Sequence, residues 1–587
     1  MTGGDQPRPY NKHVMKRLQS HSSIVRLTAG AALAALAVGS ATAQPTRPGG
    51  KPRGKIEEAE IEIVKERVNS LPESTRNFDK IKLAPPPKAE RKVPYTFPDF
   101  RLPADRLNPS VRVLTIRAEE PAPLTGNFLK AGLGNYGTFY GRAYLHSTRT
   151  TDKSYGLDIK HVNSLNGPVD GKNSGVSQSS AALSGELYRG TAAIGANLDF
   201  GRERYNFYGY NRSAGQPTPE AASIKQVFNR FGIKAYAHNR DPDQTLQYDA
   251  TLGFRRWSDN FQASENDFTV KGKAGYALGA TSRVTLTADA SFIGQKDSAL
   301  SRSRTFIQAT PAYELTGKRL SLTLGATLGY SSDTVNNVGK AALYPALRLG
   351  YSLLPEKLLV YGGLGGALQR VTLYDLSTEN PWLNQRLNVA DTRRGPTVYG
   401  GFQATPARGL ELNVRATYSR DKNLYFYLNN PSNPAKFDLV YDREATGLLN
   451  IHGELLYSAA ERFRLGGRLD YNKYDLKTLA QPFHRPELQA SLFGSYNLFD
   501  KLLLGVETYF YAASYGISYN RASGVPVPDF YRATDPIYDL NLRADYRITP
   551  KFSIFVMGNN LAGRQYQRFY GYPVKGINAL GGATYSF

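Results

Sequence analysis

The feature that most constrains this sequence is a strict two-residue alternation of apolar and polar side chains that recurs along most of the chain. In residues 320–330, leucine, alanine and tyrosine occupy every second position, and serine, threonine and glycine fill the positions between them. Residues 284–292, 410–418 and 540–548 repeat the pattern. This period places one row of side chains on each face of a pleated strand. The sequence therefore predicts a chain built mainly of β-strands.

The length of the alternating segments separates a membrane barrel from a soluble β-sandwich. Most of them run for 10–15 residues, whereas strands of soluble proteins typically have about 5–6. A strand that crosses a bilayer at a tilt needs about 9–11 residues. Many segments carry Tyr or Phe near one end and charged side chains on the second face, which suits an aromatic girdle and a wet lumen. These features favour the membrane barrel.

Residues 126–587 contain 22 candidate strands, the first at 127–134 and the last at 575–587. Short, turn-rich links alternate with long ones, and the long links include 164–176, 204–220, 375–390, 421–444 and 515–534. Outer-membrane barrels have short periplasmic turns and longer extracellular loops. We therefore predict an all-β fold, a 22-stranded antiparallel transmembrane β-barrel in the outer membrane of a Gram-negative bacterium. A short, largely irregular N-terminal segment and the C-terminus would lie in the periplasm, with outer-membrane lipid around the barrel.

Residues 15–43 have the three parts of a secretory signal peptide. Lys16 and Arg17 provide a basic start, residues 27–38 are apolar, and a small-residue cleavage site ends at Ala43, before Gln44. The apolar run is shorter than the about 20 residues that a spanning helix needs. The sequence thus predicts export with cleavage between Ala43 and Gln44, and residues 1–14 are interpreted as a non-coding or upstream extension.

The last candidate strand ends in two aromatic residues on one face, Tyr585 and Phe587. A C-terminal aromatic residue on such a strand resembles the signal that the outer-membrane barrel assembly machinery reads. We therefore predict that machinery as a partner.

A resemblance to the TonB-dependent receptor family rests on the strand count and on the C-terminal residues. Asn560, Leu561, Arg564 and Tyr566 fit the Asn-Leu-Phe-Asp-(Lys/Arg)-x-Tyr type run that commonly precedes the last strand in that family, and Ala562 replaces its aromatic residue. The resemblance covers residues 126–587. It implies uptake of a nutrient (a siderophore, a carbohydrate or a peptide) across the outer membrane.

The chain departs from that family before the barrel. Residues 44–125 form a segment of 82 residues that is rich in Pro and Lys, and no globular plug pattern can be read in it. We interpret it as a reduced plug or a tail. Within it, Ile61, Glu62, Ile63 and Val64 could add a strand to TonB, in the manner of a TonB box. TonB, a separate plug or a surface lipoprotein are the further partners that the resemblance implies.

Aromatic residues on the long links are the candidate ligand contacts, because aromatic stacking with a few hydrogen bonds suits each of these ligand classes. The alternative role for each is packing of the loops or a place in the aromatic girdle. The candidates are Tyr205, Phe207, Tyr208, Tyr210, Trp382, Tyr425, Phe426, Tyr427, Phe530, Tyr531, Tyr566, Phe569, Tyr570 and Tyr572.

Composition and motifs argue against several other classes of protein. The chain has no Cys and only seven scattered His, so no thiolate site exists and no metal centre is predicted. The net charge of +23 would suit a nucleic-acid binder, but the even spread of Tyr, Gly and Thr does not, and no nucleic-acid partner is expected. Nucleophile-elbow, zinc-protease and phosphate-loop motifs are missing. We therefore predict no enzyme and no cofactor.

Two functions stay open at this point. The first is transport by a TonB-dependent receptor-like barrel with a reduced or separate plug. The second is a non-transporting barrel that serves as a scaffold or subunit of an outer-membrane assembly or secretion complex.

Overall fold

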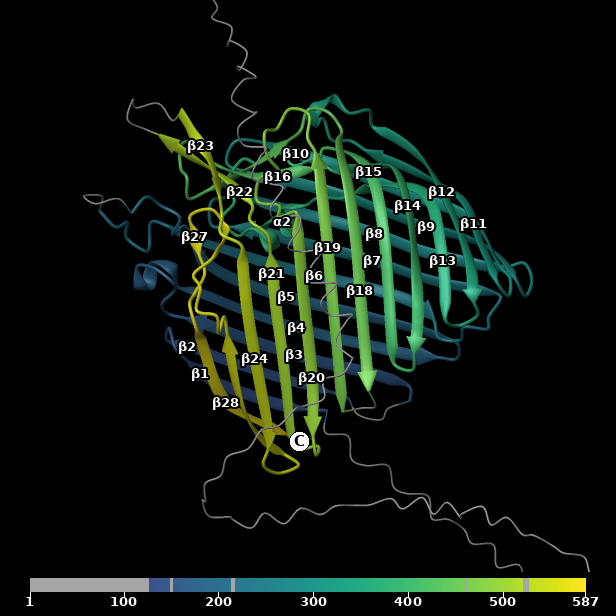
Figure 1. Cartoon of the computed structure of the whole chain (residues 1–587), viewed down its shortest axis with the longest axis horizontal. Coiled ribbons are helices and arrows are strands. Elements are labelled where there is room, and N and C mark those ends of the chain that lie inside the picture. Colours follow the sequence, from purple (N-terminus) through teal and green to yellow (C-terminus); the bar gives the residue numbers. More distant parts are fainter. Residues whose placement is uncertain (1–125, 148–150, 213–216, 460–461, 521–526) are drawn as a thin grey trace, which may run out of the picture. The chain divides into compact units, whose positions relative to one another are not determined.

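The computed structural model describes residues 126–147, 151–212, 217–459, 462–520 and 527–587 of the chain (Figure 1). The predictions for residues 1–14, the signal peptide, the Ala43–Gln44 cleavage site, the 44–125 segment and the strand at Ile61–Val64 all lie outside these residues. For residues 520–532 only the backbone is described.

A single antiparallel sheet of 22 strands forms the body of the described structure. Its strands are β1 (Phe128–Gly134), β2 (Thr138–His146), β3 (Lys153–Ser164), β4 (Val176–Arg189), β5 (Ala192–Asn206), β6 (Lys225–Asn239), β7 (Leu246–Asp259), β8 (Ser264–Ala277), β9 (Ser282–Lys296), β10 (Ser301–Thr316) and β11 (Leu320–Ser331). The sheet continues with β12 (Ala341–Leu354), β13 (Leu358–Gln369), β14 (Thr392–Ala407), β15 (Leu410–Lys422), β18 (Thr446–Ala459), β19 (Phe463–Asp475), β20 (Leu488–Leu498), β21 (Leu502–Tyr511), β24 (Ile537–Arg547), β25 (Phe552–Asn559) and β28 (Asn578–Ser586).

The sheet closes on itself, because the first strand, β1, pairs with the last, β28. In that pair Leu129 lies opposite Tyr585, and both side chains are on the outer face and about half exposed. Closure leaves no free strand edge in the barrel wall. The predicted fold and the strand count of 22 are therefore confirmed.

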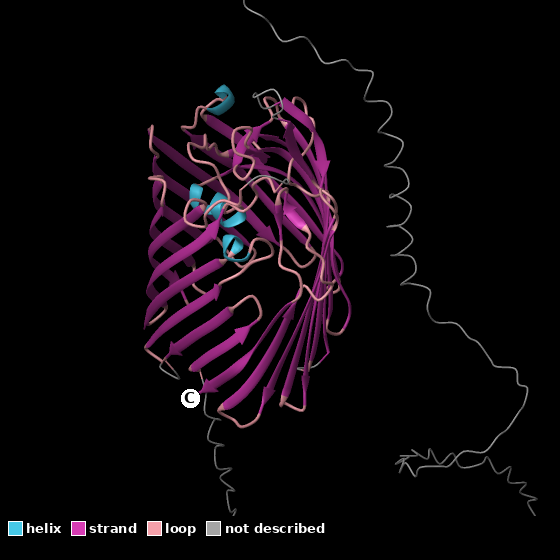
Figure 2. Ribbon diagram, turned by 90° about the vertical axis from the view of Figure 1, so that its left-hand side faces the viewer, coloured by secondary structure: helices cyan, strands magenta, loops and turns pink. Residues whose placement is uncertain are grey.

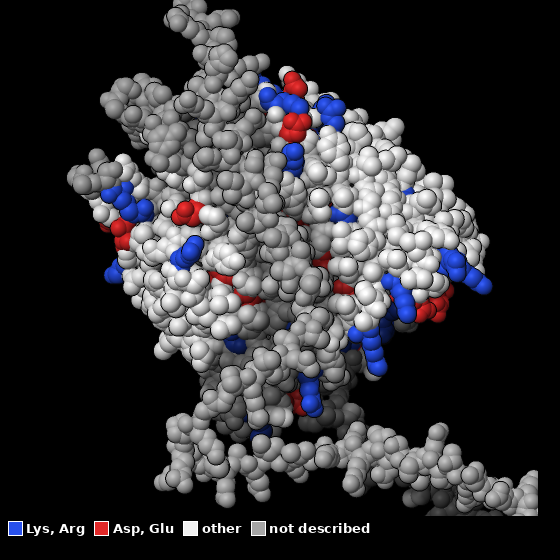
Figure 3. Space-filling view, in the orientation of Figure 1, with Lys and Arg blue, Asp and Glu red and all other residues white. Residues whose placement is uncertain are grey.

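The two-residue alternation separates an apolar outer face from a polar lumen. Leu320, Leu324 and Leu328 of β11 are 43%, 45% and 51% exposed on the outside. Such a continuous apolar surface is not stable in water and suits a bilayer. On the visible face in Figure 3, charged residues lie mainly toward the rims. Inside, Lys271 pairs with Asp289 at 3.1 Å, so the polar row forms salt bridges across strands.

Several short elements lie in the long loops, and none of them was predicted. They are the α-helix α2 (Leu373–Glu379), the 3-10 helices η3 (Gly171–Ser174) and η4 (Val335–Asn337), and the strand pairs β16 (Tyr425–Asn429) with β17 (Phe437–Tyr441), β22 (Tyr515–Asn520) with β23 (Val527–Ala533), and β26 (Gln567–Phe569) with β27 (Tyr572–Pro573). β13 ends at Gln369, and the chain then turns into α2. Within the described residues, no helix is long and apolar enough to cross a membrane.

Candidate functional site

Four long loops at one end of the barrel turn inward and meet inside it. They are the β5–β6 loop (207–212 and 217–224), the β13–β14 loop (370–391), the β15–β18 loop (423–445) and the β25–β28 loop (560–577), which together we call the cap. Figure 2 shows short helical segments enclosed by the ring of strands. The cap is the candidate functional site because it lies inside the lumen, where a substrate would pass.

A hydrophobic cluster holds the four loops of the cap together. Tyr208, Leu376, Tyr427 and Tyr572 come from the four different loops, and each is at most 7% exposed. Trp382 stacks on Tyr572 with their ring centroids 3.8 Å apart. Burying aromatic side chains is the largest apolar contribution that loops of this size can make.

Hydrogen bonds between the loops show that the cap reaches across the lumen. The Tyr208 hydroxyl donates to Pro573 O at 3.2 Å, and Trp382 Nε1 donates to Asn206 O at 3.1 Å. In the order of strands round the barrel, the β5–β6, β13–β14 and β25–β28 loops arise about a third of the circumference apart. Loops that start so far apart on a ring can contact one another only near its axis. The cap therefore occupies the middle of the lumen and not one wall.

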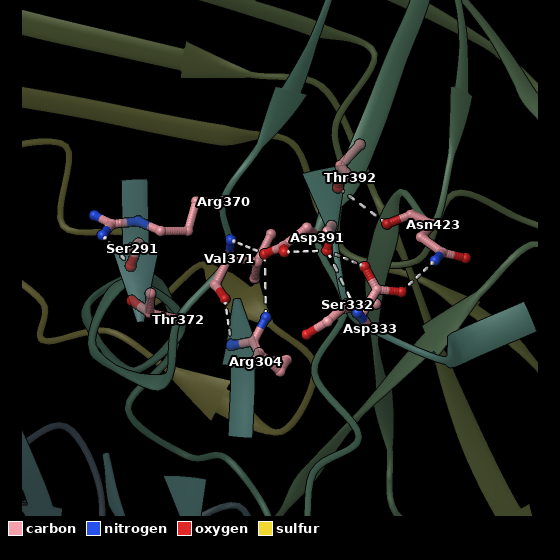
Figure 4. A network of polar contacts seen from close by, with 12 residues as sticks. Ser291, Arg304, Ser332, Asp333, Arg370, Val371, Thr372, Asp391, Thr392 and Asn423 are labelled. Carbon is pink, nitrogen blue, oxygen red and sulfur yellow. Dashed lines mark hydrogen bonds and ion pairs between the residues drawn. The ribbon is translucent and has the colours of Figure 1, made fainter. Parts of the chain in front are cut away.

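A buried polar network ties the β13–β14 loop to the inner wall of the barrel (Figure 4). We call its six residues the anchor: Glu265, Asp267, Ser291, Arg304, Arg370 and Asp391. Arg304 of β10 pairs with Asp391 at 3.1 Å and donates from Nη2 to Val371 O at 2.8 Å. Asp391 in turn accepts from Val371 N at 3.0 Å. One strand residue thus fixes both ends of the loop.

The other half of the anchor holds the start of the loop and of α2. Arg370 pairs with Asp267 of β8 at 2.9 Å and donates to Ser291 Oγ at 3.0 Å. Glu265 accepts hydrogen bonds from Leu373 N at 3.0 Å and Tyr374 N at 3.3 Å. These N–H groups belong to the first turn of α2, where backbone N–H groups find no acceptor within the helix. The helix dipole also favours a carboxylate at this end.

Two carboxyl groups share one hydroxyl beside the anchor. The Ser331 hydroxyl lies 2.7 Å from both Asp333 Oδ2 and Asp391 Oδ2. A hydroxyl has a single proton, so it can donate fully to only one of the two carboxyl groups at a time. Burial raises the pKa of Asp333, and the neighbouring Asp391 raises it further.

A small cavity of about 70 Å³ lies under the cap, and its lining includes Glu379, His484, Arg485 and Arg568. Glu379 accepts hydrogen bonds from the hydroxyls of Tyr425 at 2.8 Å and Tyr427 at 3.0 Å. Burial and the Glu379 charge raise the pKa of Tyr425 to about 12. These tyrosines are thus neutral hydrogen-bond donors, and the cavity presents charge of both signs to the lumen.

The aromatic residues predicted as ligand contacts are mostly found inside the cap. Phe207, Tyr208, Phe426, Tyr427, Phe569 and Tyr572 are buried, and Tyr205, Tyr210, Trp382, Tyr425, Tyr566 and Tyr570 are partly buried. Phe530 and Tyr531 lie in β23, where only the backbone is described. In this structure the buried group performs the packing role that the sequence allowed as an alternative. Direct ligand contact by these residues stays a prediction.

The residues of the anchor were not identified from the sequence. Glu265, Asp267 and Arg304 occupy lumen-facing positions close to the loop ends of β8 and β10. A charged residue at such a position can be recognised from the sequence as a candidate loop contact, because the polar row there faces loops and not open water. Arg370 and Asp391 carry no comparable signal, since they lie in a loop and their partners are up to 103 residues away in the chain.

The C-terminal motif forms a fixed corner after β25. Asn560 has a left-handed backbone (φ 48°), and its Nδ2 donates to Arg564 O and Lys575 O, both at 2.7 Å. The Tyr566 hydroxyl donates to Asp539 Oδ2 on the neighbouring strand β24. These contacts explain why an Asn and a Tyr stand at those two positions of the run, where the chain turns into the cap.

Comparison with known proteins finds likeness in structure alone. No protein-family model matches the sequence, and no curated protein sequence matches it. The iron transporter FrpB from Neisseria meningitidis matches with a TM-score of 0.59 at 10% identity, covering 79% of this chain and 81% of that one.

Two further structures of this kind are similar to the chain. The siderophore receptor PirA from Acinetobacter baumannii has a TM-score of 0.58 at 10% identity, covering 78% of this chain and 80% of its own. The ferric enterobactin receptor PfeA from Pseudomonas aeruginosa has a TM-score of 0.56 at 12% identity, with coverage of 78% and 80%. The described barrel thus shares the closed 22-stranded fold of TonB-dependent siderophore receptors, as the resemblance in the sequence implied.

Proposed function

We propose that this protein is an outer-membrane receptor that takes up a small nutrient and whose own loops close the barrel. The observation that carries the proposal is the cap, in which loops from separate parts of the wall meet at the axis of the lumen. A 22-stranded barrel has a wide interior, and known lumens of this size are filled. A barrel that served only as a membrane anchor would not need a buried polar network to hold a loop across its lumen.

The substrate class in this proposal is a siderophore, a carbohydrate or a peptide. A siderophore ranks first because the similar structures are named as receptors for ferric enterobactin or siderophores, or as an iron transporter. Arg485 and Arg568 beside the cavity would attract the negative charge that many iron chelates carry. Aromatic residues of the cap, such as Trp382 and Tyr425, would supply stacking surfaces once the cap moves.

Conductance tests whether the cap closes the barrel. The mature chain would be inserted into planar bilayers beside two variants, one lacking residues 44–125 and one in which a Gly-Ser linker replaces residues 373–389. We expect a closed full-length chain and an open linker variant. A large, steady conductance of the full-length chain would overturn the proposal that the cap closes it. If only the deletion of 44–125 opens the pore, that segment is the plug.

Uptake tests the receptor role itself. A bacterial strain without its own siderophore receptors would express the full chain and be supplied with radioactive iron bound to enterobactin or to a hydroxamate siderophore. Uptake above the empty-vector level, lost with the linker variant, would support a receptor for iron chelates. No uptake of either probe by a closed, correctly inserted barrel would reject the siderophore class and favour the scaffold function.

TonB and the barrel assembly machinery are the partners in this proposal. TonB would engage the strand-forming residues Ile61–Val64, and the assembly machinery would read Tyr585 and Phe587. The periplasmic domain of TonB should retain the full-length protein on a column, and deletion of residues 57–65 should abolish retention. Equal retention of both proteins would remove TonB-box function from this segment.

A further inference from the structure

A second feature lies on the outer face of the barrel at its loop end. A groove of about 700 Å³ opens there between the ends of β7, β8, β9 and β10 and the short β7–β8 and β9–β10 loops. Arg256 and Lys296 line it, together with Ser258, Ser264 and Asn266. Arg256 and Lys296 are exposed on outward-facing positions, because they alternate with the lumen-facing Trp257 and Gln295.

The groove belongs to a wider strip of positive charge. On the outward positions of β5, β6, β7 and β9 near their loop ends stand Arg202, Arg204, Lys225, Arg256 and Lys296. The strand register puts no Asp or Glu on any outward position of β5–β10. On these outward strand positions the five cations have no carboxylate among them, which favours an anion.

An aromatic row directly below the strip indicates where the strip lies relative to the membrane. Phe254, Phe268 and Phe292 are cross-strand partners on the outer face, and the rings of Phe268 and Phe292 stack with centroids 6.4 Å apart. Aromatic rows of this kind mark the membrane–water interface of a barrel. Arg256 and Lys296 lie two and four residues beyond the row, or roughly 7 and 13 Å along the strands. That distance is the level of lipid headgroups.

Two carboxylates also line the groove, but both are already engaged by the loops. Asp259 Oδ1 accepts from Phe261 N and Ala263 N, each at 2.8 Å. Asp297 Oδ1 accepts from Ala299 N at 2.8 Å and Leu300 N at 2.9 Å. By contrast, the Lys296 ammonium makes no hydrogen bond or ion pair with any residue that the structure describes. Arg256 makes one, from Nη1 to Asn266 Oδ1 at 3.0 Å, which leaves its other donors available.

We propose that this groove binds the headgroup phosphates of a phosphorylated glycolipid in the outer leaflet. The Arg256 guanidinium would take one phosphate through two parallel N–H bonds, and Lys296 would contact it or a second phosphate as a point charge. The hydroxyls of Ser258, Ser264 and Ser301 would donate to the remaining phosphate oxygens. The acyl chains would then lie on the aromatic row below. The inference rests on the outer-membrane placement proposed above but not on transport.

Native mass spectrometry of the purified full-length protein in detergent tests the lipid site. Diphosphoryl lipid A is the probe, and phosphatidylethanolamine is the comparison lipid. R256Q/K296Q should weaken binding of diphosphoryl lipid A by roughly thirtyfold, since each cation at a lipid surface contributes about a fivefold effect. Both side chains are exposed, so we expect the variant to keep the heat-dependent gel shift of a folded barrel.

R420Q/K422Q is the matched control. Arg420 and Lys422 are also exposed at outward positions near the loop end, but Arg420 shares its cross-strand row with Asp475. This variant should change binding less than twofold. Equal affinities in the wild type and both variants would overturn the proposal, and so would a wild type that binds both lipids alike. Displacement of the lipid by inorganic phosphate alone would show a site for the free anion and would also overturn it. None of these results depends on conductance or iron uptake.

Discussion

At the residue scale, Arg304 is the cation on which the anchor depends. It pairs with Asp391 at 3.1 Å and lies 3.8 Å from Glu265, and all three side chains are at most 6% exposed. Arg304→Met would leave two buried carboxylates without their cation, which typically costs about 3–5 kcal/mol. We expect the free energy of cap opening to fall by an amount of this order. The two Trp residues of the chain, Trp257 and Trp382, both lie in or against the hydrophobic cluster of the cap. The urea dependence of Trp fluorescence therefore measures the free energy of cap opening.

Arg302→Met provides the control for that measurement. Arg302 lies on the same face of β10 and donates from Nη1 to the neutral Asn388 Oδ1 at 2.7 Å, and it is only partly buried. Its loss should cost less than about 1 kcal/mol, because no buried charge is left unpaired. Equal losses in the two variants would mean that Arg304 acts through packing and not through its charge.

His484 should make the cap sensitive to acid. Its ring packs against Phe437 and Phe569, with centroids 5.2 and 5.5 Å away, and burial lowers its pKa to about 3. The cap therefore holds a neutral His484, whereas the opened chain binds a proton below about pH 6.5. The contribution of His484 to cap stability is complete above pH 6.5 and falls by roughly 1.4 kcal/mol per pH unit as the pH drops toward 3.

Acid titrations of Trp fluorescence in the wild type and His484→Phe measure this effect. The Phe variant keeps the ring packing and has no proton to bind, so its cap should open at a lower pH than that of the wild type. Other titrating groups, such as Asp333, are common to both proteins and cancel in the difference. Titration curves that coincide would show that His484 is not the acid-sensitive group.

At the scale of elements, α2 is short and depends on its first turn. The Thr372 side chain accepts from Asp375 N at 3.1 Å and donates to Asp375 Oδ2 at 2.7 Å, which caps the helix. Thr372→Ala should cost about 1 kcal/mol of cap stability, as the loss of an N-cap typically does. Thr378→Ala, which removes only an exposed bond to Tyr374 O, should cost less than half as much. Both values come from the same urea titrations, and equal costs would contradict the capping role.

The strands could be predicted from the sequence, and the cap could not. Each barrel strand repeats one signal, the alternation seen at 320–330, because every strand meets the same two surroundings, lipid and lumen. In the cap each residue meets a different partner, such as Trp382 on Tyr572 or Arg304 on Asp391. Those contacts depend on which loops meet at the axis, and no local pattern reports that. Within the cap, only α2 has a recognisable pattern in the sequence, because the spacing of Thr372 and Asp375 is typical of a helix start.

At the scale of the whole molecule, the barrel and the cap should unfold separately. The wall is a closed ladder of 22 strands with no edge from which pairing could be lost, whereas the cap is held by one hydrophobic cluster and a handful of buried ion pairs. Units of such different contact density open with different free energies. In urea, the Trp fluorescence change should therefore occur at a lower denaturant concentration than the loss of the far-ultraviolet signal of the strands. Conductance of reconstituted protein should rise with the first transition, because the cap then leaves the lumen while the wall persists. If the two spectroscopic transitions coincide, cap and wall form one cooperative unit, and a ligand could not open the cap without loosening the barrel itself.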